Sequence, residues 1–137
     1  MIFVIDASIT LAWCFKDESS AYATTILKQL ADSRAVTPSI WPLEVANALL
    51  VAERRQRLAE ADTARFLALL RSLPITVDDE TTRQALGGVL SLARDQGLSS
   101  YDVCYLELAM RQGHSMATLD NRLQEAATKL GITIVEG

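Results

Sequence analysis

The 137-residue chain has a single histidine, two cysteines and no glycine-rich loop. The one histidine, His114, excludes catalysis by a pair of histidines acting as acid and base, and no nucleophile-elbow motif supports a Ser-His-Asp triad. We expect His114 to lie in a solvated turn. Without a phosphate-binding loop or a dinucleotide fingerprint, enzymes that use nucleotide cofactors are disfavoured.

The cysteines and the lack of a long apolar run bear on the cellular setting. Cys14 and Cys104 lie in apolar, helix-like segments without the spacing of metal ligands, so we interpret both as reduced thiols of the core. No apolar run approaches the ~18 residues that span a bilayer. The N-terminus also lacks the basic start and apolar region of a signal peptide. The sequence therefore predicts a cytoplasmic protein without a membrane segment.

The order of short and long apolar patterns predicts an α/β fold. The composition, 50% apolar and 22% charged, is typical of a globular protein, and the length suits a single domain over residues 1–137. Short β-branched runs predict strands at residues 2–5, 35–37, 75–77, 115–118 and 132–135. Helical periodicity covers residues 8–15, 20–31, 43–55, 59–73, 81–96, 101–111 and 121–130. This alternation indicates a parallel sheet with helices on both faces.

Four acids stand at junctions between these elements. Asp6 and Asp120 directly follow apolar runs that are predicted to be strands, and Glu44 and Asp102 lie near the starts of predicted helices. Because ligands of open parallel sheets bind outside the carboxyl ends of the strands, the four side chains could share one cleft. Carboxylates brought that close repel one another unless a cation binds them, and oxygen ligands suit hard divalent cations.

Each acid also has an ordinary structural explanation. Glu44 and Asp102 would interact favourably with the helix dipole in a first helical turn, and Asp120 could cap the next helix. Asp6 is harder to explain in this way, because a carboxylate that ends a buried strand needs a partner. The hypothesis of a metal site therefore rests on the combination of the four.

The charge of the chain leaves the nature of its partner open. The net charge of −4 argues against a polyanionic partner, although a bound divalent metal would offset the negative charge locally. A basic stretch lies in the middle of the chain and comprises Arg54, Arg55, Arg57, Arg65 and Arg71. A solvated helical face would explain any one of these arginines.

Four motifs in a fixed order carry a resemblance to a known family. They are Val4-Ile5-Asp6-Ala7-Ser8, Glu44-Val45-Ala46-Asn47-Ala48-Leu49, Ser99-Ser100-Tyr101-Asp102 and Ala117-Thr118-Leu119-Asp120-Asn121-Arg122-Leu123. In order and spacing they resemble the motifs of PIN-domain ribonucleases, and most nearly those of VapC-type toxins from bacterial toxin-antitoxin pairs. The resemblance covers essentially the whole chain.

The resemblance implies a three-layer α/β/α domain with a five-stranded parallel sheet. It further implies a metal-dependent endoribonuclease in which Mg²⁺ or Mn²⁺ is held by Asp6, Glu44, Asp102 and Asp120. Asn47 matches a polar neighbour of the family's acids, and Thr118 or Ser8 would orient a carboxylate or a water. The implied partners are an RNA substrate and a cognate antitoxin protein.

The predicted helices at residues 43–55 and 59–73 bear on assembly. Together they carry more apolar surface than a small sheet can cover, so one of them could form a homodimer surface. The alternative is that both pack in the core. Together with the resemblance, they lead us to expect a homodimer whose antitoxin lies along a helical groove and places a basic side chain in the acidic site.

Three other functions are compatible with parts of the sequence. A metal-dependent phosphatase also ends its first strand with an aspartate, but it would usually carry a second aspartate two residues later, where this chain has Ser8. A PIN-type housekeeping nuclease would act without an antitoxin. A non-catalytic module of the same fold would use its acids only to bind a partner, and intact acids at all four positions weigh against it.

Overall fold

Four short parallel strands form the centre of the molecule in the computed structural model, which describes residues 1–18 and 20–137. The strands are β1 (Ile2–Ile5), β2 (Arg34–Thr37), β3 (Ile75–Val77) and β4 (Ser115–Ala117). Their order in the sheet is β3-β2-β1-β4, and every neighbouring pair is parallel. In register, Val4 of β1 pairs with Val36 on one side and with Met116 on the other.

The prediction of a fifth strand at residues 132–135 is wrong. Ile134 forms one isolated parallel bridge with Met116 instead of a ladder. Two backbone hydrogen bonds make this bridge, from Met116 N to Thr133 O (2.9 Å) and from Val135 N to Met116 O (2.8 Å). The apolar pattern correctly indicates a buried extended segment, since Ile132 and Val135 are buried. Side-chain pattern alone does not reveal whether the backbone pairing continues beyond one residue.

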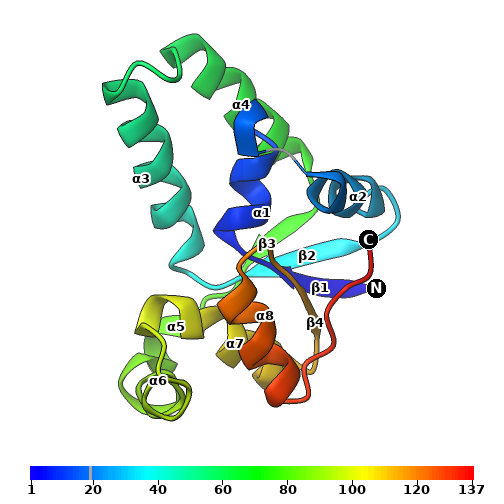
Figure 1. Cartoon of the computed structure of the whole chain (residues 1–137), viewed down its shortest axis with the longest axis vertical. Coiled ribbons are helices and arrows are strands. Elements are labelled where there is room, and N and C mark those ends of the chain that lie inside the picture. Colours follow the sequence, from blue (N-terminus) through cyan, green and yellow to red (C-terminus); the bar gives the residue numbers. More distant parts are fainter. Residues whose placement is uncertain (19) are drawn as a thin grey trace.

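Helices cover both faces of the sheet (Figure 1). Above it in that view lie α1 (Ala7–Ala12), α2 (Ala21–Gln29), α3 (Trp41–Arg54) and α4 (Glu60–Ser72), with a short 3₁₀ turn, η1 (Lys16–Glu18), after α1. Below it lie α5 (Thr81–Gln84), the π-helical segment η2 (Ala85–Val89), α6 (Leu90–Gln96), α7 (Ser100–Gln112) and α8 (Asn121–Lys129). The three layers agree with the predicted architecture.

The predicted helix at residues 81–96 is interrupted. Its middle part is π-helical, and the backbone N–H of Leu90 donates to the carbonyl of Ala85, five residues earlier. Gly87 and Gly88 lie in this segment, where glycines weaken the regular α-helical ladder. The first predicted helix also differs, because it begins at Ala7 and ends at Ala12 rather than covering residues 8–15.

The central strand β1 has no polar face, because both faces of the sheet are covered there. Phe3 and Ile5 of β1 pack into a cluster with Ile9 of α1 and Ile26 of α2. Val4, between them, belongs to the cluster on the opposite face. Phe3, Val4 and Ile5 are all fully buried. Continuous apolar runs of this kind are what a doubly covered parallel sheet requires.

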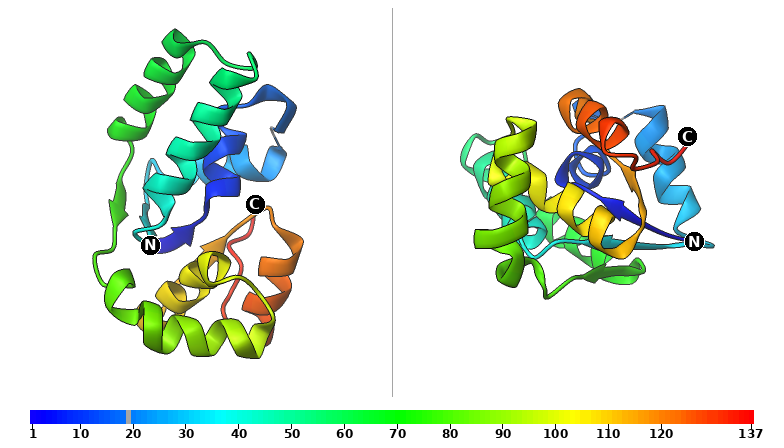
Figure 2. Two further views of the ribbon diagram at one scale, coloured as in Figure 1. Left: turned by 90° about the vertical axis from the view of Figure 1, so that its left-hand side faces the viewer. Right: turned by 90° about the horizontal axis from the view of Figure 1, so that it is seen from below.

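Helices α3 and α4 form an antiparallel arm that projects beyond the sheet (Figure 2). Helix α3 buries four side chains, whereas Phe66 is the only buried side chain of α4. An apolar groove runs between the two helices and is lined by side chains that include Val45, Leu49, Leu67 and Leu70. The arm therefore both contributes to the core through α3 and leaves an apolar surface uncovered.

No helix within the described ranges is long and apolar enough to cross a membrane.

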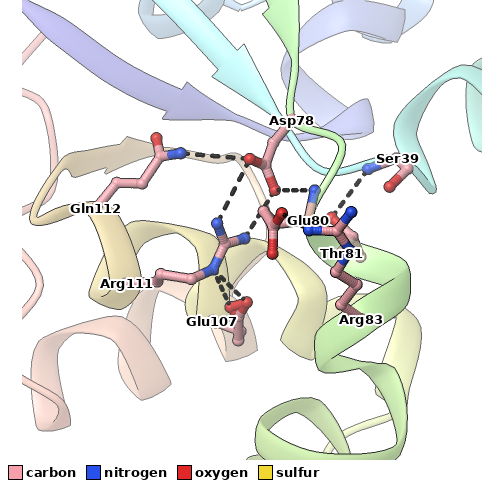
Figure 3. Close-up of polar contacts among 8 residues, drawn as sticks. All are labelled: Ser39, Asp78, Glu80, Thr81, Arg83, Glu107, Arg111 and Gln112. Atoms are coloured by element: carbon pink, nitrogen blue, oxygen red, sulfur yellow. Dashed lines mark hydrogen bonds and ion pairs between the residues drawn. The ribbon is translucent and has the colours of Figure 1, made fainter.

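An ionic network of two buried carboxylates and one partly exposed arginine anchors the end of α7 to the loop that follows β3 (Figure 3). Arg111 donates through Nη2 to Oδ2 of Asp78 (2.7 Å) and through Nε to Oε1 of Glu107 (2.8 Å). Gln112 adds a hydrogen bond from Nε2 to Oδ1 of Asp78 (3.3 Å). Asp78 and Glu107 are each only 8% exposed, so the guanidinium is the charge that compensates both carboxylates.

We expect Arg111→Gln to lower the free energy of unfolding by about 3 kcal/mol, because it leaves two buried carboxylates without their cation. Chemical denaturation monitored by circular dichroism measures the change. The matched control is Arg83→Gln, since Arg83 forms an exposed ion pair with Glu80 and should cost less than about 1 kcal/mol. Equal effects of the two substitutions would contradict this role of Arg111.

Candidate functional site

The four candidate acids lie on elements that begin at the carboxyl end of the sheet. Asp6 follows β1 as the N-cap of α1, and Asp120 follows β4 as the N-cap of α8. Glu44 and Asp102 lie in the first turns of α3 and α7. Because β1 and β4 are neighbours in the sheet, Asp6 and Asp120 follow the ends of adjacent strands. Figure 1 shows α1 and α3 rising from the same end of the sheet.

Asp6 is the most deeply buried of these acids, with 4% of its surface exposed. Its Oδ1 accepts hydrogen bonds from the Ser8 hydroxyl (2.6 Å) and from the Ile9 amide (3.2 Å). Its Oδ2 accepts a hydrogen bond from the Thr118 hydroxyl. Burial raises the pKa of Asp6, these three donors oppose the rise, and the charge of Asp120 adds to it. The carboxylate is thus paired with neutral donors rather than with a cation.

The two hydroxyls also tie the end of β4 to Asp6. The Ser8 hydroxyl oxygen accepts from the Leu119 amide (3.0 Å), and the Thr118 hydroxyl oxygen accepts from the Asp120 amide (3.0 Å). Each hydroxyl therefore connects the Asp6 carboxylate to the backbone of the loop that carries Asp120. Ser8 and Thr118, which the sequence suggested as orienting residues, make direct contact with this acid.

Glu44 is held by a tyrosine from another helix. The Tyr105 hydroxyl of α7 donates to Oε1 of Glu44 (2.5 Å). Burial raises the pKa of Glu44, the hydrogen bond from Tyr105 lowers it, and the charges of Asp102 and Asp6 raise it further. Burial, with the nearby carboxylates, also raises the pKa of Tyr105 far above its ordinary value, so the phenol remains a hydrogen-bond donor at neutral pH.

Asp102 and Asp120 are more accessible than Asp6. Oδ1 of Asp120 caps α8 by accepting from the amides of Arg122 (2.9 Å) and Leu123 (3.2 Å). The start of α7 is capped by the Ser99 hydroxyl, which accepts from the Asp102 amide (3.1 Å). The capping role predicted for Asp120 is therefore present, and its second oxygen, Oδ2, faces no protein donor among the described hydrogen bonds.

The acids form one electrostatic group. In addition to burial, the negative charge of Asp120 raises the pKa of Asp6, and the charges of Asp102 and Asp6 raise the pKa of Glu44. Within the part of the chain that the structure describes, no three acidic, histidine or cysteine side chains lie close enough together to hold one ion alone. The acids thus interact through their charges without forming a closed cage.

This donor set fits a hard divalent cation. Mg²⁺ keeps several of its waters and commonly uses only one or two carboxylates, so a closed cage is not needed. Burial raises the pKa values of Asp6 and Glu44, and repulsion from neighbouring acids adds to the rise; a bound cation would relieve that repulsion. Asn47 is exposed one helical turn after Glu44, on the same helix.

The sequence reasoning missed Tyr105. A signal was available, because Tyr105 follows Asp102 by three residues and such residues share a helix face. His114 lies before β4, at the opposite end of that strand from Asp120, and is partly exposed. Both cysteines are free thiols, as predicted. Burial raises the pKa of Cys104 to about 11, whereas Cys14 is only partly buried.

A model of the PIN domain matches residues 3–129 of the chain. The ribonuclease VapC3 of Pyrobaculum aerophilum is 29% identical over 125 residues, which cover 91% of this chain and 94% of that protein. The VapC20 toxin of Mycobacterium tuberculosis, which cleaves the sarcin-ricin loop, superposes with a TM-score of 0.64 at 16% identity over all of both chains. VapBC2 of Rickettsia felis, solved with a DNA fragment from their promoter, gives 0.64 at 15% identity over 98% of each chain.

In a metal-free buffer with chelator, we expect the wild type to lose stability relative to Asp6→Asn as the pH rises from about 4 to 7. The folded-state pKa of Asp6 lies above its unfolded value, so ionisation is penalised in the folded state and stability falls as pH rises through that window. Denaturant unfolding of both proteins across this range measures the difference, which contains the ionisation of Asp6 and its effect on the pKa of Glu44. A constant difference would show that Asp6 ionises in the folded protein as readily as in the unfolded one.

Proposed function

The chain belongs to the PIN-domain family, and on that premise we propose that it is a metal-dependent endoribonuclease that hydrolyses RNA phosphodiester bonds as the toxin of a toxin-antitoxin pair. It is a homologue of VapC-type ribonucleases. The observation that carries the proposal is the buried Asp6 carboxylate, which is held by hydroxyls and lies near other acids, while none of the ion pairs among the described residues involves the four candidate acids. Such a group is costly unless it binds a cation.

The residues that would hold Mg²⁺ or Mn²⁺ are Asp6, Glu44, Asp102 and Asp120. When bound, a divalent ion lowers the pKa of a water for attack on phosphorus and stabilises charge on the phosphate oxygens. This supply of a nucleophile at neutral pH is consistent with a chain whose one histidine lies at the other end of β4.

The side chains around the acids would orient them. Ser8 and Thr118 fix both oxygens of Asp6 and, by donating hydrogen bonds, favour its ionised form. The exposed amide of Asn47 would contact the phosphate or a water beside Glu44. The roles of these three residues are secondary to those of the four acids, because none of them carries a charge.

Substrate phosphates would meet basic side chains on the arm formed by α3 and α4. Arg54, Arg55 and Arg71 are exposed there. Two other arginines of this stretch are paired with acids, Arg57 with Asp17 and Arg65 with Asp62. An arginine that already has a carboxylate partner must give it up to bind phosphate. Arg54, Arg55 and Arg71 are therefore the stronger candidates for phosphate contacts.

The partner proposal rests on the apolar groove of the arm and on the acidic site, which share helix α3. We expect a homodimer that binds a small antitoxin, with an apolar segment of the antitoxin lying in the groove between α3 and α4. Helix α3 lines that groove with Val45 and also carries Glu44, the residue before it, so an antitoxin that continues past the groove would reach the acids. An arginine of the antitoxin could form bidentate pairs with Asp or Glu and thereby compete with the metal.

We expect the purified protein to cleave single-stranded RNA only with Mg²⁺ or Mn²⁺. Asp6→Asn or Asp120→Asn should reduce cleavage to background, because each substitution removes the charge of a ligand at nearly constant volume. Product ends should be 5′-phosphate and 3′-hydroxyl, because water rather than the neighbouring 2′-hydroxyl attacks phosphorus. Gel assays and end analysis by mass spectrometry test this.

The control for this experiment is His114→Ala, which should leave cleavage nearly unchanged. Product ends with a cyclic 2′,3′-phosphate, or full activity in EDTA, would contradict the metal-dependent hydrolytic mechanism. If either Asp variant kept near wild-type turnover at saturating metal, that acid would not be a principal ligand. Metal binding without cleavage of any RNA would favour the non-catalytic module.

Expression of the protein alone should arrest growth, and co-expression with the product of the neighbouring gene should restore it. The reason is that a basic side chain of the partner would compete with the metal for the acids, and the bound partner would keep RNA out of the site. Growth curves, cleavage assays and gel filtration of the co-purified proteins measure these effects. Normal growth at confirmed levels of the protein alone, or a neighbour that neither binds nor inhibits it, would reject the toxin-antitoxin pairing and leave a PIN-type housekeeping nuclease.

A further inference from the structure

Glu44 differs from the other acids in how it is held. Asp6 and Asp120 accept hydrogen bonds from backbone amides of the helices that they cap. Glu44 lies inside the first turn of α3, whose N-cap makes no side-chain hydrogen bond. Among the described residues, the hydrogen bond to the Glu44 carboxylate comes from the Tyr105 hydroxyl. The longest and most flexible of the four acids therefore depends on a side chain of another helix.

Tyr105 is well placed to fix Glu44. It is 2% exposed, so its ring is locked by packing in the core. It follows Asp102 by one helical turn, so α7 brings a carboxylate and a phenol to the same face. A rigid ring on α7 thus places a hydroxyl donor against the carboxylate at the start of α3.

We propose that Tyr105 is a positioning residue of the metal site, whose hydroxyl holds the Glu44 carboxylate in the orientation that binds the divalent ion. This inference rests on the proposed function for the identity of the site. Packing alone does not explain the hydroxyl, because phenylalanine would fill the same volume without placing a polar atom in the core. Hydrogen bonds from outer residues to ligating carboxylates are a general means of fixing ligand geometry.

The test is the affinity of Tyr105→Phe for Mn²⁺, measured by isothermal calorimetry without any RNA. We expect binding at least about tenfold weaker than in the wild type, as is typical when such an outer partner is lost. In a Glu44→Gln background the same substitution should have little further effect, because the group that Tyr105 positions is already altered. In the wild-type background, cleavage by Tyr105→Phe should recover as the Mn²⁺ concentration is raised.

The matched control is Tyr22→Phe. The Tyr22 hydroxyl donates to the Val135 carbonyl (2.6 Å), so this variant loses a similar hydrogen bond that does not involve a site carboxylate. It should keep wild-type affinity for Mn²⁺. Thermal unfolding of both variants shows whether each remains folded at the temperature of the titration.

Unchanged Mn²⁺ affinity in folded Tyr105→Phe would overturn the inference, as would an equal loss of affinity in Tyr22→Phe. A tenfold loss that persists in the Glu44→Gln background would also overturn it, because Tyr105 would then act through another group. A wild type that binds Mn²⁺ but cleaves no RNA would reject the proposed activity, while the binding data would still support the positioning role of Tyr105.

Discussion

The burial of the Asp6 carboxylate is the constraint on which the site depends. Asp6 ends the central strand β1 and is 4% exposed, so its charge must be satisfied inside the protein. The structure provides neutral donors, the hydroxyls of Ser8 and Thr118 and the Ile9 amide. Because none of them is a cation, the carboxylate keeps its negative field, and the pKa rises through burial. That field is what a divalent ion would recognise.

The same constraint organises the neighbouring elements. Thr118 belongs to the loop after β4, so the hydrogen bond to Asp6 joins the ends of two adjacent strands. Asp120 follows on that loop, and the hydroxyl of Tyr105 on α7 holds Glu44 at the start of α3. The site is therefore assembled from several elements, none of which contains it alone. Repulsion among the acids opposes folding, as is common where a binding site is pre-organised.

Stability must then come from elsewhere in the fold. The buried strands supply apolar contacts on both faces of the sheet. The network of Arg111 with Asp78 and Glu107 fixes the far end of α7, the helix that carries Asp102 and Tyr105 at or near its start. In this network the acids are neutralised by a guanidinium, whereas no such side chain bonds to the candidate site in the described residues. The buried carboxylates of Asp78 and Glu107 thus have a cationic partner, whereas the buried carboxylate of Asp6 has neutral donors.

Local sequence determined the elements and the candidate acids. Apolar runs ending in Asp6 and Asp120 indicated where strands stop, since a strand ends where polar side chains begin. Only the tertiary structure decided which contacts form: the bridge of Ile134 in place of a fifth strand, and the hydrogen bond from Tyr105 to Glu44. Periodicity specifies which face of an element is buried. It carries no information on backbone pairing at one residue, or on which side chains meet across 61 positions of the chain, because those contacts depend on how whole elements pack.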